Sequence, residues 1–326
     1  MDKEKKIFLS VMIPVYNKSE YLDMCLNSIV TDKMDDLEII VVDDGSTDDS
    51  YSKLTEWCKK DSRIRVFHQE NGGVASARSY ALSKAKGEYI INCDPDDWVE
   101  PGTYSQLKLV AQKTDADVII FDIIRNCSDG TETANRLYID CSPSAHCRST
   151  FISLLKSRNY STCNKMIRRK IVEDNQIDYL QGIDVGEDFL FIAKVFLALP
   201  KNSVCAKIDK ALYHYRETPG FNSLTQKVTY KSLLGHEEII KWRLKNMDIP
   251  ELSHYNRRAL FHFCYLMLRC DNCPDEYAKS YAKQYLHYGI FIESKICTKW
   301  IIALMLKLLG YSFTRKCFSF IKKILN

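Results

Sequence analysis

Three polar clusters, each following a short apolar run, hold the residues of this sequence that could bind a nucleotide. They read PVYN at 14–17, DDGS at 43–46 and DPDDW at 94–98. A tyrosine such as Tyr16 could stack on a base, and the carboxylates of Asp43 and Asp44 could accept its N–H groups. The carboxylates at 94–97 could hold Mg²⁺ or Mn²⁺, which proteins bind through one or two carboxylates together with water and diphosphate oxygens. The clusters therefore indicate a nucleotide diphosphate bound with a divalent cation.

Two common phosphate-binding patterns do not occur in the sequence. Neither the dinucleotide fingerprint GxGxxG nor the phosphate loop GxxxxGK[ST] is found. Hydride transfer and P-loop chemistry thereby lose their main support.

The hydrophobic pattern predicts a sheet that would bring the three clusters together. Runs rich in Ile and Val, separated by segments of helical periodicity, occur at 7–13, 37–42, 64–67, 89–91 and 118–121. This alternation is typical of βαβ units and predicts an α/β protein with a mostly parallel sheet flanked by helices. Such sheets bind ligands at the carboxyl ends of their strands, which is where the clusters fall.

Cap and stop residues predict where two of the helices lie. Asn17 or Ser19 is expected to cap the helix between the first two runs, and Gly87 to stop a later one. Beyond about residue 225 the pattern changes to helices only. The residues expected on their buried faces are Trp242, Leu260, Phe263 and Leu266.

Composition and charge bound the class of protein. With 326 residues, 46% hydrophobic and 27% charged, the chain is globular and long enough for about two domains. Residues 227–326 carry 17 basic and 8 acidic side chains, a net charge of +9, whereas residues 1–226 carry a net −5. A basic C-terminal region favours an acidic partner, and we expect a membrane surface rather than nucleic acid because no nucleic-acid reader motif occurs.

Cysteine usage and the N-terminus predict the compartment. The 13 cysteines follow no small-domain disulfide spacing, and the charged start MDKEKK has no apolar signal region behind it. We expect reduced thiols and a cytoplasmic protein at the inner face of the cell membrane.

Six motifs then occur in one order across residues 8 to about 225. They are VMIPVYNKSEYLDMCLNSI, IIVVDDGSTDDS, NGGVASARSYALSKAKGEYIINCDPDDW with Pro101, CNKMIRRK, GEDFLF and LYHYR. In these motifs the sequence resembles the family 2 inverting glycosyltransferases of the bacterial surface-polysaccharide type. The resemblance implies the GT-A fold, which is a Rossmann-like, mostly parallel sheet flanked by helices, followed here by a C-terminal α-helical extension.

The resemblance implies a nucleotide-sugar site. Pro14 and Tyr16 would line the base pocket, and Asp44, with Asp43 beside it, would bond the uracil or other base. Residues 71–73 would form a flexible turn before the arginine of the third motif. The diphosphate half of the site would consist of Arg78 near the diphosphate, Asp94 on the ribose or sugar, Asp96 on the metal, His214 on the metal or diphosphate, and Arg216 on phosphate.

The resemblance also implies a catalytic base. Asp188 of GEDFLF falls where the family places its base, with Glu187 beside it. Pro95 departs from the Ser or Ala more usual inside the DxD motif, and it removes only a backbone N–H.

Simpler structural roles are open for several of these residues. Tyr16 could be a core aromatic, and His214 a satisfied core histidine. Asp43 could cap the following helix, and Glu187 with Asp188 could be an N-terminal helix pair. Arg78 could be a solvated helix residue.

The predicted function is an inverting glycosyltransferase. It would transfer a sugar from a nucleotide diphosphate sugar, UDP above all, to a hydroxyl of a glycan or lipid-linked glycan, with Mn²⁺ or Mg²⁺ as cofactor. Two alternatives are a nucleotidyltransferase of similar fold and a non-catalytic nucleotide-sugar-binding assembly subunit. The expected domains are a catalytic domain at 1–225, with a nucleotide-sugar half at about 1–125 and an acceptor half at about 126–225, and a helical basic region at 226–326.

The last 32 residues predict contact with a membrane surface. Residues 295–326 carry seven basic and no acidic side chains, interleaved with apolar ones. The apolar run 300–306 is far shorter than the roughly 18–20 residues that span a bilayer. We expect this segment to lie on an anionic membrane, and the alternative is a helix pair packed on the catalytic domain.

Overall fold

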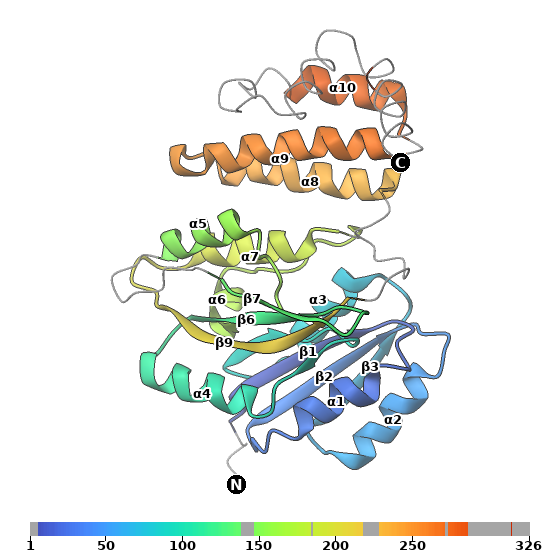
Figure 1. Ribbon diagram of the computed structural model, residues 1–326, viewed down its shortest axis with the longest axis vertical. Helices are drawn as coiled ribbons and strands as arrows, with labels where there is room; N and C mark the ends of the chain where they lie inside the picture. Colours follow the sequence, from blue (N-terminus) through green and yellow to red (C-terminus); the bar gives the residue numbers. More distant parts are fainter. Residues whose placement is uncertain are drawn as a thin grey trace. The chain divides into compact units, whose positions relative to one another are not determined.

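The computed structural model describes residues 6–137, 147–183, 185–217, 228–270, 273–285 and 314. The chain divides into two units, the first comprising Met1–Gly182 and Glu187–Phe221 and the second Ile183–Gly186 and Asn222–Asn326 (Figure 1). The sequence predicts one boundary near residue 225, and it does not anticipate that a short segment before Glu187 joins the second unit.

A nine-stranded sheet forms the centre of the first unit. Its strands are β1 (Leu9–Val15), β2 (Leu37–Asp44), β3 (Ile64–Gln69), β4 (Tyr89–Asn92), β5 (Trp98–Val99), β6 (Val118–Asn126), β7 (Glu132–Asn135), β8 (Lys165–Arg168) and β9 (Cys205–Arg216). They are arranged in the order β3-β2-β1-β4-β8-β6-β9-β5, with β7 paired to β6. The five runs expected from the sequence correspond to β1, β2, β3, β4 and β6.

The strands that the three polar clusters follow belong to the parallel part of the sheet. Strands β3, β2, β1 and β4 run parallel, so that the carboxyl ends of β1, β2 and β4 meet at one edge. Antiparallel pairing enters through β8, which lies between β4 and β6, and through β5, which pairs with β9. The expected mixed, mostly parallel α/β architecture is confirmed.

Helices cover both faces of the sheet. In the first unit they are α1 (Leu22–Val30), α2 (Ser50–Lys60), α3 (Val74–Lys84), α4 (Thr103–Thr114), α5 (Cys147–Ser157), α6 (Arg169–Asp174) and α7 (Glu187–Ala198). Figure 1 shows α5 and α7 on one side of the sheet and α1 and α4 on the other. Every residue of β1 and β2 is buried as a result, which explains why these strands read as continuous apolar runs.

The expected cap of α1 is wrong. The helix begins at Leu22, and Tyr21 precedes it without a side-chain cap. The Asn17 side chain instead accepts the backbone N–H of Thr47 at 2.7 Å, and the Ser19 backbone N–H donates to Asp48. Both expected caps are therefore used to join the loop after β1 to the loop after β2.

The secondary-structure elements described in the second unit are helices. They are α8 (Tyr230–Asn246), α9 (Pro250–Arg269) and α10 (Asp275–Tyr285). Thr229 caps α8 in a reciprocal capping box with Ser232. Leu260, Phe263 and Leu266 are buried in a common core, as expected, whereas Trp242 is half-buried.

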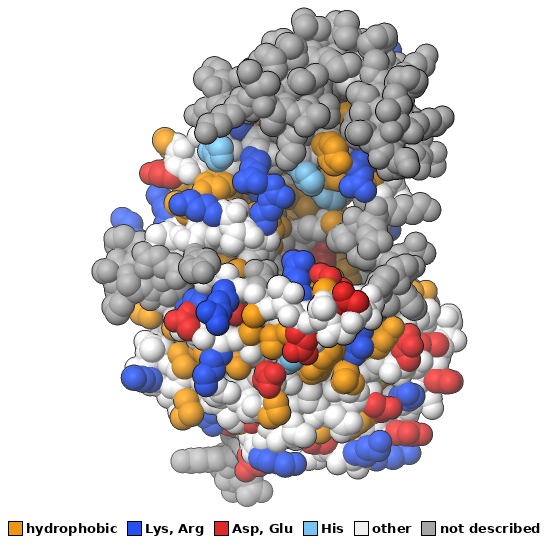
Figure 2. Space-filling model, in the orientation of Figure 1, with side chains coloured by type: hydrophobic (Ala, Val, Ile, Leu, Met, Phe, Trp, Pro, Cys, Tyr) orange, Lys and Arg blue, Asp and Glu red, His pale blue; other side chains and the backbone are white. Residues whose placement is uncertain are grey.

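Figure 2 shows acidic and basic side chains interspersed on the visible face of the first unit. Among the described residues, every helix is too short or too polar to cross a lipid bilayer. The basic segment 295–326 lies outside the described residues except for Thr314.

Candidate functional site

A buried arginine joins the polar clusters into one site. Arg78 lies on α3 and is only 4% exposed. Its Nη1 donates to Glu187 Oε1 at 2.9 Å and to Asp188 Oδ1 at 2.6 Å, and its Nη2 donates to Asp94 Oδ1 at 2.9 Å. The solvated role considered for Arg78 is therefore wrong. The guanidinium connects the turn after β4 to the first turn of α7.

The charges of this cluster are strongly coupled. Burial alone would lower the pKa of Arg78, but Asp188, Asp94 and Glu187 outweigh it and raise its pKa well above the usual range. Burial, followed by repulsion from Asp188, raises the pKa of Glu187 to about 7, although Arg78 opposes this shift. The cluster can thus hold or release a proton near neutral pH.

Asp188 occupies the N-terminal turn of α7, where the unpaired N–H groups of a helix favour a carboxylate. Besides Arg78, it accepts the Thr162 backbone N–H at 3.3 Å on Oδ2 and the Thr162 hydroxyl at 3.2 Å on Oδ1. These bonds fix the orientation of the Asp188 carboxylate. A carboxylate held in this way can accept a proton from a hydroxyl.

The two carboxylates at the end of β2 have different environments. Asp44 accepts Gln69 Nε2 at 2.7 Å and the backbone N–H groups of Gly72 and Gly73 at 2.9 and 2.8 Å. It therefore fixes the turn that starts α3. That turn needs glycine at position 73, where φ is +85°.

Asp43 is fully buried and points one oxygen at His68, whose Nδ1 lies 2.8 Å from Asp43 Oδ2. No described group hydrogen-bonds to Oδ1. The helix α2 begins at Ser50 behind Asp49, so Asp43 is not its cap. An orphaned buried carboxylate oxygen next to a strand end is suited to accept an N–H from a ligand.

The first strand supplies the remaining base-pocket residues that the sequence suggested. Pro14 is buried in β1 opposite Val42. Tyr16 follows the strand and is 47% exposed, which excludes the core-aromatic reading. Its ring is available to a ligand at the same sheet edge.

The DPDD turn splits its carboxylates between the surface and the interior. Asp96 pairs with the Lys18 ammonium at 2.5 Å, and both side chains are about one-third exposed. Asp97 is buried and accepts the Tyr213 hydroxyl at 2.6 Å and the Arg216 backbone N–H at 2.8 Å, so it does not extend the carboxylate cluster of Asp94 and Asp96 as expected. Burial, with repulsion from Asp94 and Asp96, raises the pKa of Asp97 well above its usual range.

His214 packs beside this turn. It stacks on Trp98 with ring centroids 4.8 Å apart, and its Nε2 lies 2.7 Å from Glu100 Oε1 while its Nδ1 lies 3.1 Å from Asn126 Nδ2. Both ring nitrogens therefore contact protein groups. Arg216 donates from Nε to the Asp96 carbonyl and lies over the Trp98 ring.

Two carboxylates of the turn suit a divalent cation. Among the described residues, one oxygen each of Asp94 and Asp96 has no protein partner, and Mg²⁺ or Mn²⁺ needs only one or two carboxylates when diphosphate oxygens supply the rest. The described residues contain no group of three His, Cys, Asp or Glu side chains that could hold a metal alone. The donor set therefore fits a metal that binds together with a diphosphate.

Sequence reasoning missed three side chains of this site. Lys18 pairs with Asp96, and Thr162 donates to Asp188. The third is Tyr179, whose ring centroid lies 5.8 Å from the guanidinium carbon of Arg78. Lys18 and Thr162 stand within or beside the quoted motifs, so the signal was available. Nothing in the sequence around Tyr179 marks it, because its partners come from distant segments.

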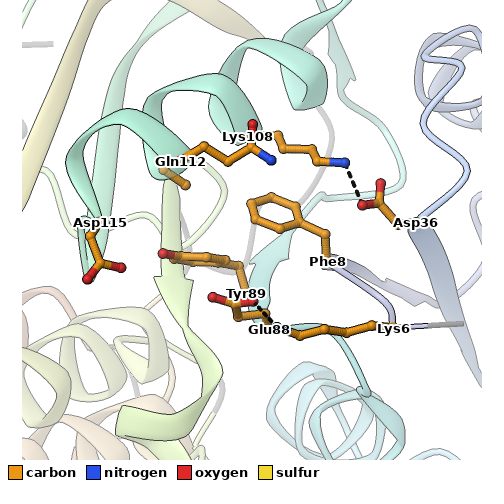
Figure 3. A pocket seen from close by; sticks show the side chains of 9 residues that line it. Lys6, Phe8, Asp36, Glu88, Tyr89, Lys108, Gln112 and Asp115 are labelled. Carbon is orange, nitrogen blue, oxygen red and sulfur yellow. Dashed lines mark hydrogen bonds and ion pairs between the residues drawn. The ribbon is translucent and has the colours of Figure 1, made fainter.

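A cavity of about 420 Å³ lies at the other end of the strands. Figure 3 shows Phe8 and Tyr89 beside Lys108, at the starts of β1 and β4. Its charged groups are already paired, Lys108 with Asp36 at 2.5 Å and Glu88 with Lys6 at 2.8 Å. The polar clusters do not reach it, and it is not the candidate active site.

A family model and a curated relative match the chain. The model of the family described as Glycosyl transferase family 2 matches residues 10–175, just over half of the chain. EpsJ of Bacillus subtilis (strain 168), described as an uncharacterized glycosyltransferase, is 28% identical over 264 residues, which cover 78% of this chain and 72% of EpsJ.

Two solved structures share the fold. TarS of S. aureus, residues 1–349 in complex with UDP-GlcNAc, has a TM-score of 0.65 and 19% identity over 93% of this chain and 92% of that one. The mannosyltransferase PcManGT of Pyrobaculum calidifontis, in complex with GDP-Man and Mn²⁺, has a TM-score of 0.54 and 13% identity over 96% of this chain and 83% of that one. The fold is therefore GT-A, as expected.

The coupled carboxylates predict a pH-dependent stability. The pKa of Glu187 rises from an ordinary 4.5 to about 7 on folding, so the folded protein holds a proton there that the unfolded chain has released. Wild-type stability should fall as the pH rises through this window, by on the order of 1–3 kcal/mol for this group. Glu187→Gln cannot titrate, so its stability relative to wild type should increase from pH 4.5 to 7.

Chemical denaturation of both proteins across this pH range measures the difference. The difference should be constant above pH 8, where the group is ionised in both states. A relative stability of the variant that decreases with rising pH would contradict the assignment.

Proposed function

The chain belongs to glycosyl transferase family 2 and is a glycosyltransferase, and we propose that it transfers a sugar with inversion from a UDP-sugar to an acceptor hydroxyl. The observation that carries this proposal is the contact of one buried guanidinium with both Asp94 and Asp188. The same cation therefore binds Asp94, which is proposed for the diphosphate side, and Asp188, which is the proposed base.

The strand ends support a nucleotide donor. Tyr16 is exposed for stacking, and Asp43 has an orphaned buried oxygen that suits an N–H of a base. Asp44 contributes by fixing the turn at 71–73 rather than by a free oxygen. The choice of uridine draws on the likeness to TarS, which was solved with UDP-GlcNAc.

Asp188 is the proposed base. Inversion requires the acceptor oxygen to attack the anomeric carbon opposite the diphosphate, so that the new C–O bond forms as the bond to the diphosphate oxygen breaks. The acceptor proton passes to Asp188, whose carboxylate is held in place by hydrogen bonds from Arg78 and Thr162. The electron pair of the broken bond leaves with the diphosphate.

Asp96 and Asp94 would hold a divalent cation, which would neutralise charge on the departing diphosphate. Lys18 already places a cation 2.5 Å from Asp96 and would compete with a metal for that carboxylate. His214 contacts Glu100 and Asn126, and we assign it to packing against Trp98 rather than to the metal.

The acceptor proposed is a glycan or lipid-linked glycan of a bacterial surface polysaccharide. It would be met at the inner face of the cell membrane, with residues 295–326 lying on the lipid. Support comes from the seven basic side chains of that segment and the apolar ones between them.

Replacing the base tests the mechanism. Asp188→Asn should lower kcat by about 10² or more with nearly unchanged UDP affinity, because the lone pair is used only in the transition state. Product formation with a panel of UDP-sugars and calorimetric titration of UDP measure the two effects. Asp209→Asn, an exposed carboxylate away from the site, is the matched control. Normal turnover by Asp188→Asn would move the role to another residue.

Removing the proposed metal ligand tests the cofactor. Asp96→Ala should abolish the Mn²⁺-dependent part of UDP binding and leave the melting temperature nearly unchanged, because Asp96 is partly exposed. Calorimetry of UDP with and without Mn²⁺ gives the result, with Asp115→Ala as control. Equal Mn²⁺-dependent affinity in the variant and wild type would refute the assignment.

Truncation tests the membrane contact. The full chain should co-sediment with anionic liposomes, less so at high salt, since each basic residue near an anionic surface contributes on the order of 1 kcal/mol. A chain ending before residue 295 should lose this binding and keep turnover on a soluble acceptor. Equal liposome binding by both chains would eliminate the anchor, and an insoluble truncated chain would favour helices packed on the catalytic domain.

A further inference from the structure

A fully buried lysine near the proposed base has no part in the mechanism described so far. Lys165 is the first residue of β8, pairs with Ile120 in the sheet and has no exposed surface. Lysine is almost never fully buried unless its charge is paired. Its presence inside the sheet therefore requires an explanation.

The Lys165 ammonium uses all three of its N–H groups on one neighbouring segment. It donates to Asn159 Oδ1 at 2.6 Å, to the Ser161 carbonyl at 2.7 Å and to Asn164 Oδ1 at 2.8 Å. Asn164 is itself tied to the sheet, because its Nδ2 donates to the Phe121 carbonyl at 2.7 Å. These hydrogen bonds thus fix the connection between α5 and β8 around the Lys165 ammonium.

That connection also carries the residue that holds Asp188. Thr162 lies between two of the acceptors and donates both its backbone N–H and its hydroxyl to the Asp188 carboxylate. A continuous set of hydrogen bonds therefore runs from Lys165 through the segment 159–164 to Asp188. Arg78 contacts the same carboxylate from α3, so Asp188 is fixed from two directions.

We propose that Lys165 is a positioning residue for Asp188, acting through the segment 159–164 and the two Thr162 hydrogen bonds. The inference rests on the proposed function, since it concerns the orientation of the proposed base. It explains why a lysine stands where an apolar residue would fill the same space without the cost of burying a charge.

The charge itself is held at a cost. Burial lowers the pKa of the Lys165 ammonium to about 7, and the nearby Asp188 carboxylate and Cys163 oppose that shift. The three oxygen acceptors are thus what the cation gains inside the protein. A methionine of similar length would fill the same space but would lose the hydrogen bonds to these three acceptors.

A double-mutant cycle tests the inference. Lys165→Met and Thr162→Val should each lower kcat by about 10-fold, because a base misplaced by a fraction of an ångström loses its geometry with the acceptor. UDP affinity should change less than about twofold. The double variant should be no slower than the slower single variant, because both changes disturb the same bonds to Asp188.

Lys194→Met is the matched control. Lys194 is a half-buried lysine that donates to the Asp178 carbonyl and does not contact Asp188. It should leave kcat unchanged. Thr162→Ser, which keeps the hydroxyl, should recover most of the activity that Thr162→Val loses.

A lysine that only stabilises the fold gives a different result. Either of two results would overturn the inference, provided that Asp188→Asn is still impaired. One is that the two changes have additive effects on log kcat, and the other is that Lys165→Met has a normal kcat. Normal turnover by Asp188→Asn would overturn the proposed base and the inference together.

If Lys165→Met does not fold, Asn159→Ala replaces it in the cycle. It removes one acceptor and leaves the lysine in place. A lower kcat that is non-additive with Thr162→Val supports the proposal, and an unchanged kcat overturns it.

Discussion

One buried guanidinium is the interaction on which the candidate site depends. Asp94, Glu187 and Asp188 could not be brought together as carboxylates without a cation between them, because their charges repel in a region largely withdrawn from water. Arg78 supplies that cation from α3, which the Asp44 clamp on the turn at 71–73 holds in place. The turn that Asp44 fixes at the end of β2 is therefore linked through Arg78 to the carboxylates at the start of α7.

The sequence predicts the parts of this fold that are determined locally. Strands β1 and β2 are buried on both faces, so their apolar runs identify them without any knowledge of their neighbours. Strand β5 has two residues and β8 has four, and both exist because of their antiparallel partners rather than their own pattern. The expected cap of α1 failed for the same reason, since Asn17 and Ser19 bond to a loop about 30 residues away.

The types of residue in the site were also easier to predict from the sequence than the groups to which each residue bonds. The DDGS and DPDD clusters reveal carboxylates at strand ends, yet the roles divide in a way that spacing does not show. Asp44 fixes a turn, while one Asp43 oxygen has no hydrogen-bond partner among the described residues. Asp97 faces the interior, while Asp96 pairs with Lys18. The partners of Arg78 on α7 lie 109 and 110 positions further along the chain, so only the folded protein reveals them.

The separation of 109 and 110 positions between Arg78 and its partners on α7 limits how the first unit can be divided into fragments. The segment that carries the family signature ends at residue 175, before α7 begins at Glu187. A minimal fragment cut to that signature would keep Arg78 and Asp94 but lose two of the three carboxylates around the guanidinium. Such a fragment would hold an under-compensated buried charge, so the signature marks a recognisable stretch of sequence rather than an autonomous module. Exchange of parts between relatives would have to carry α3 and α7 together.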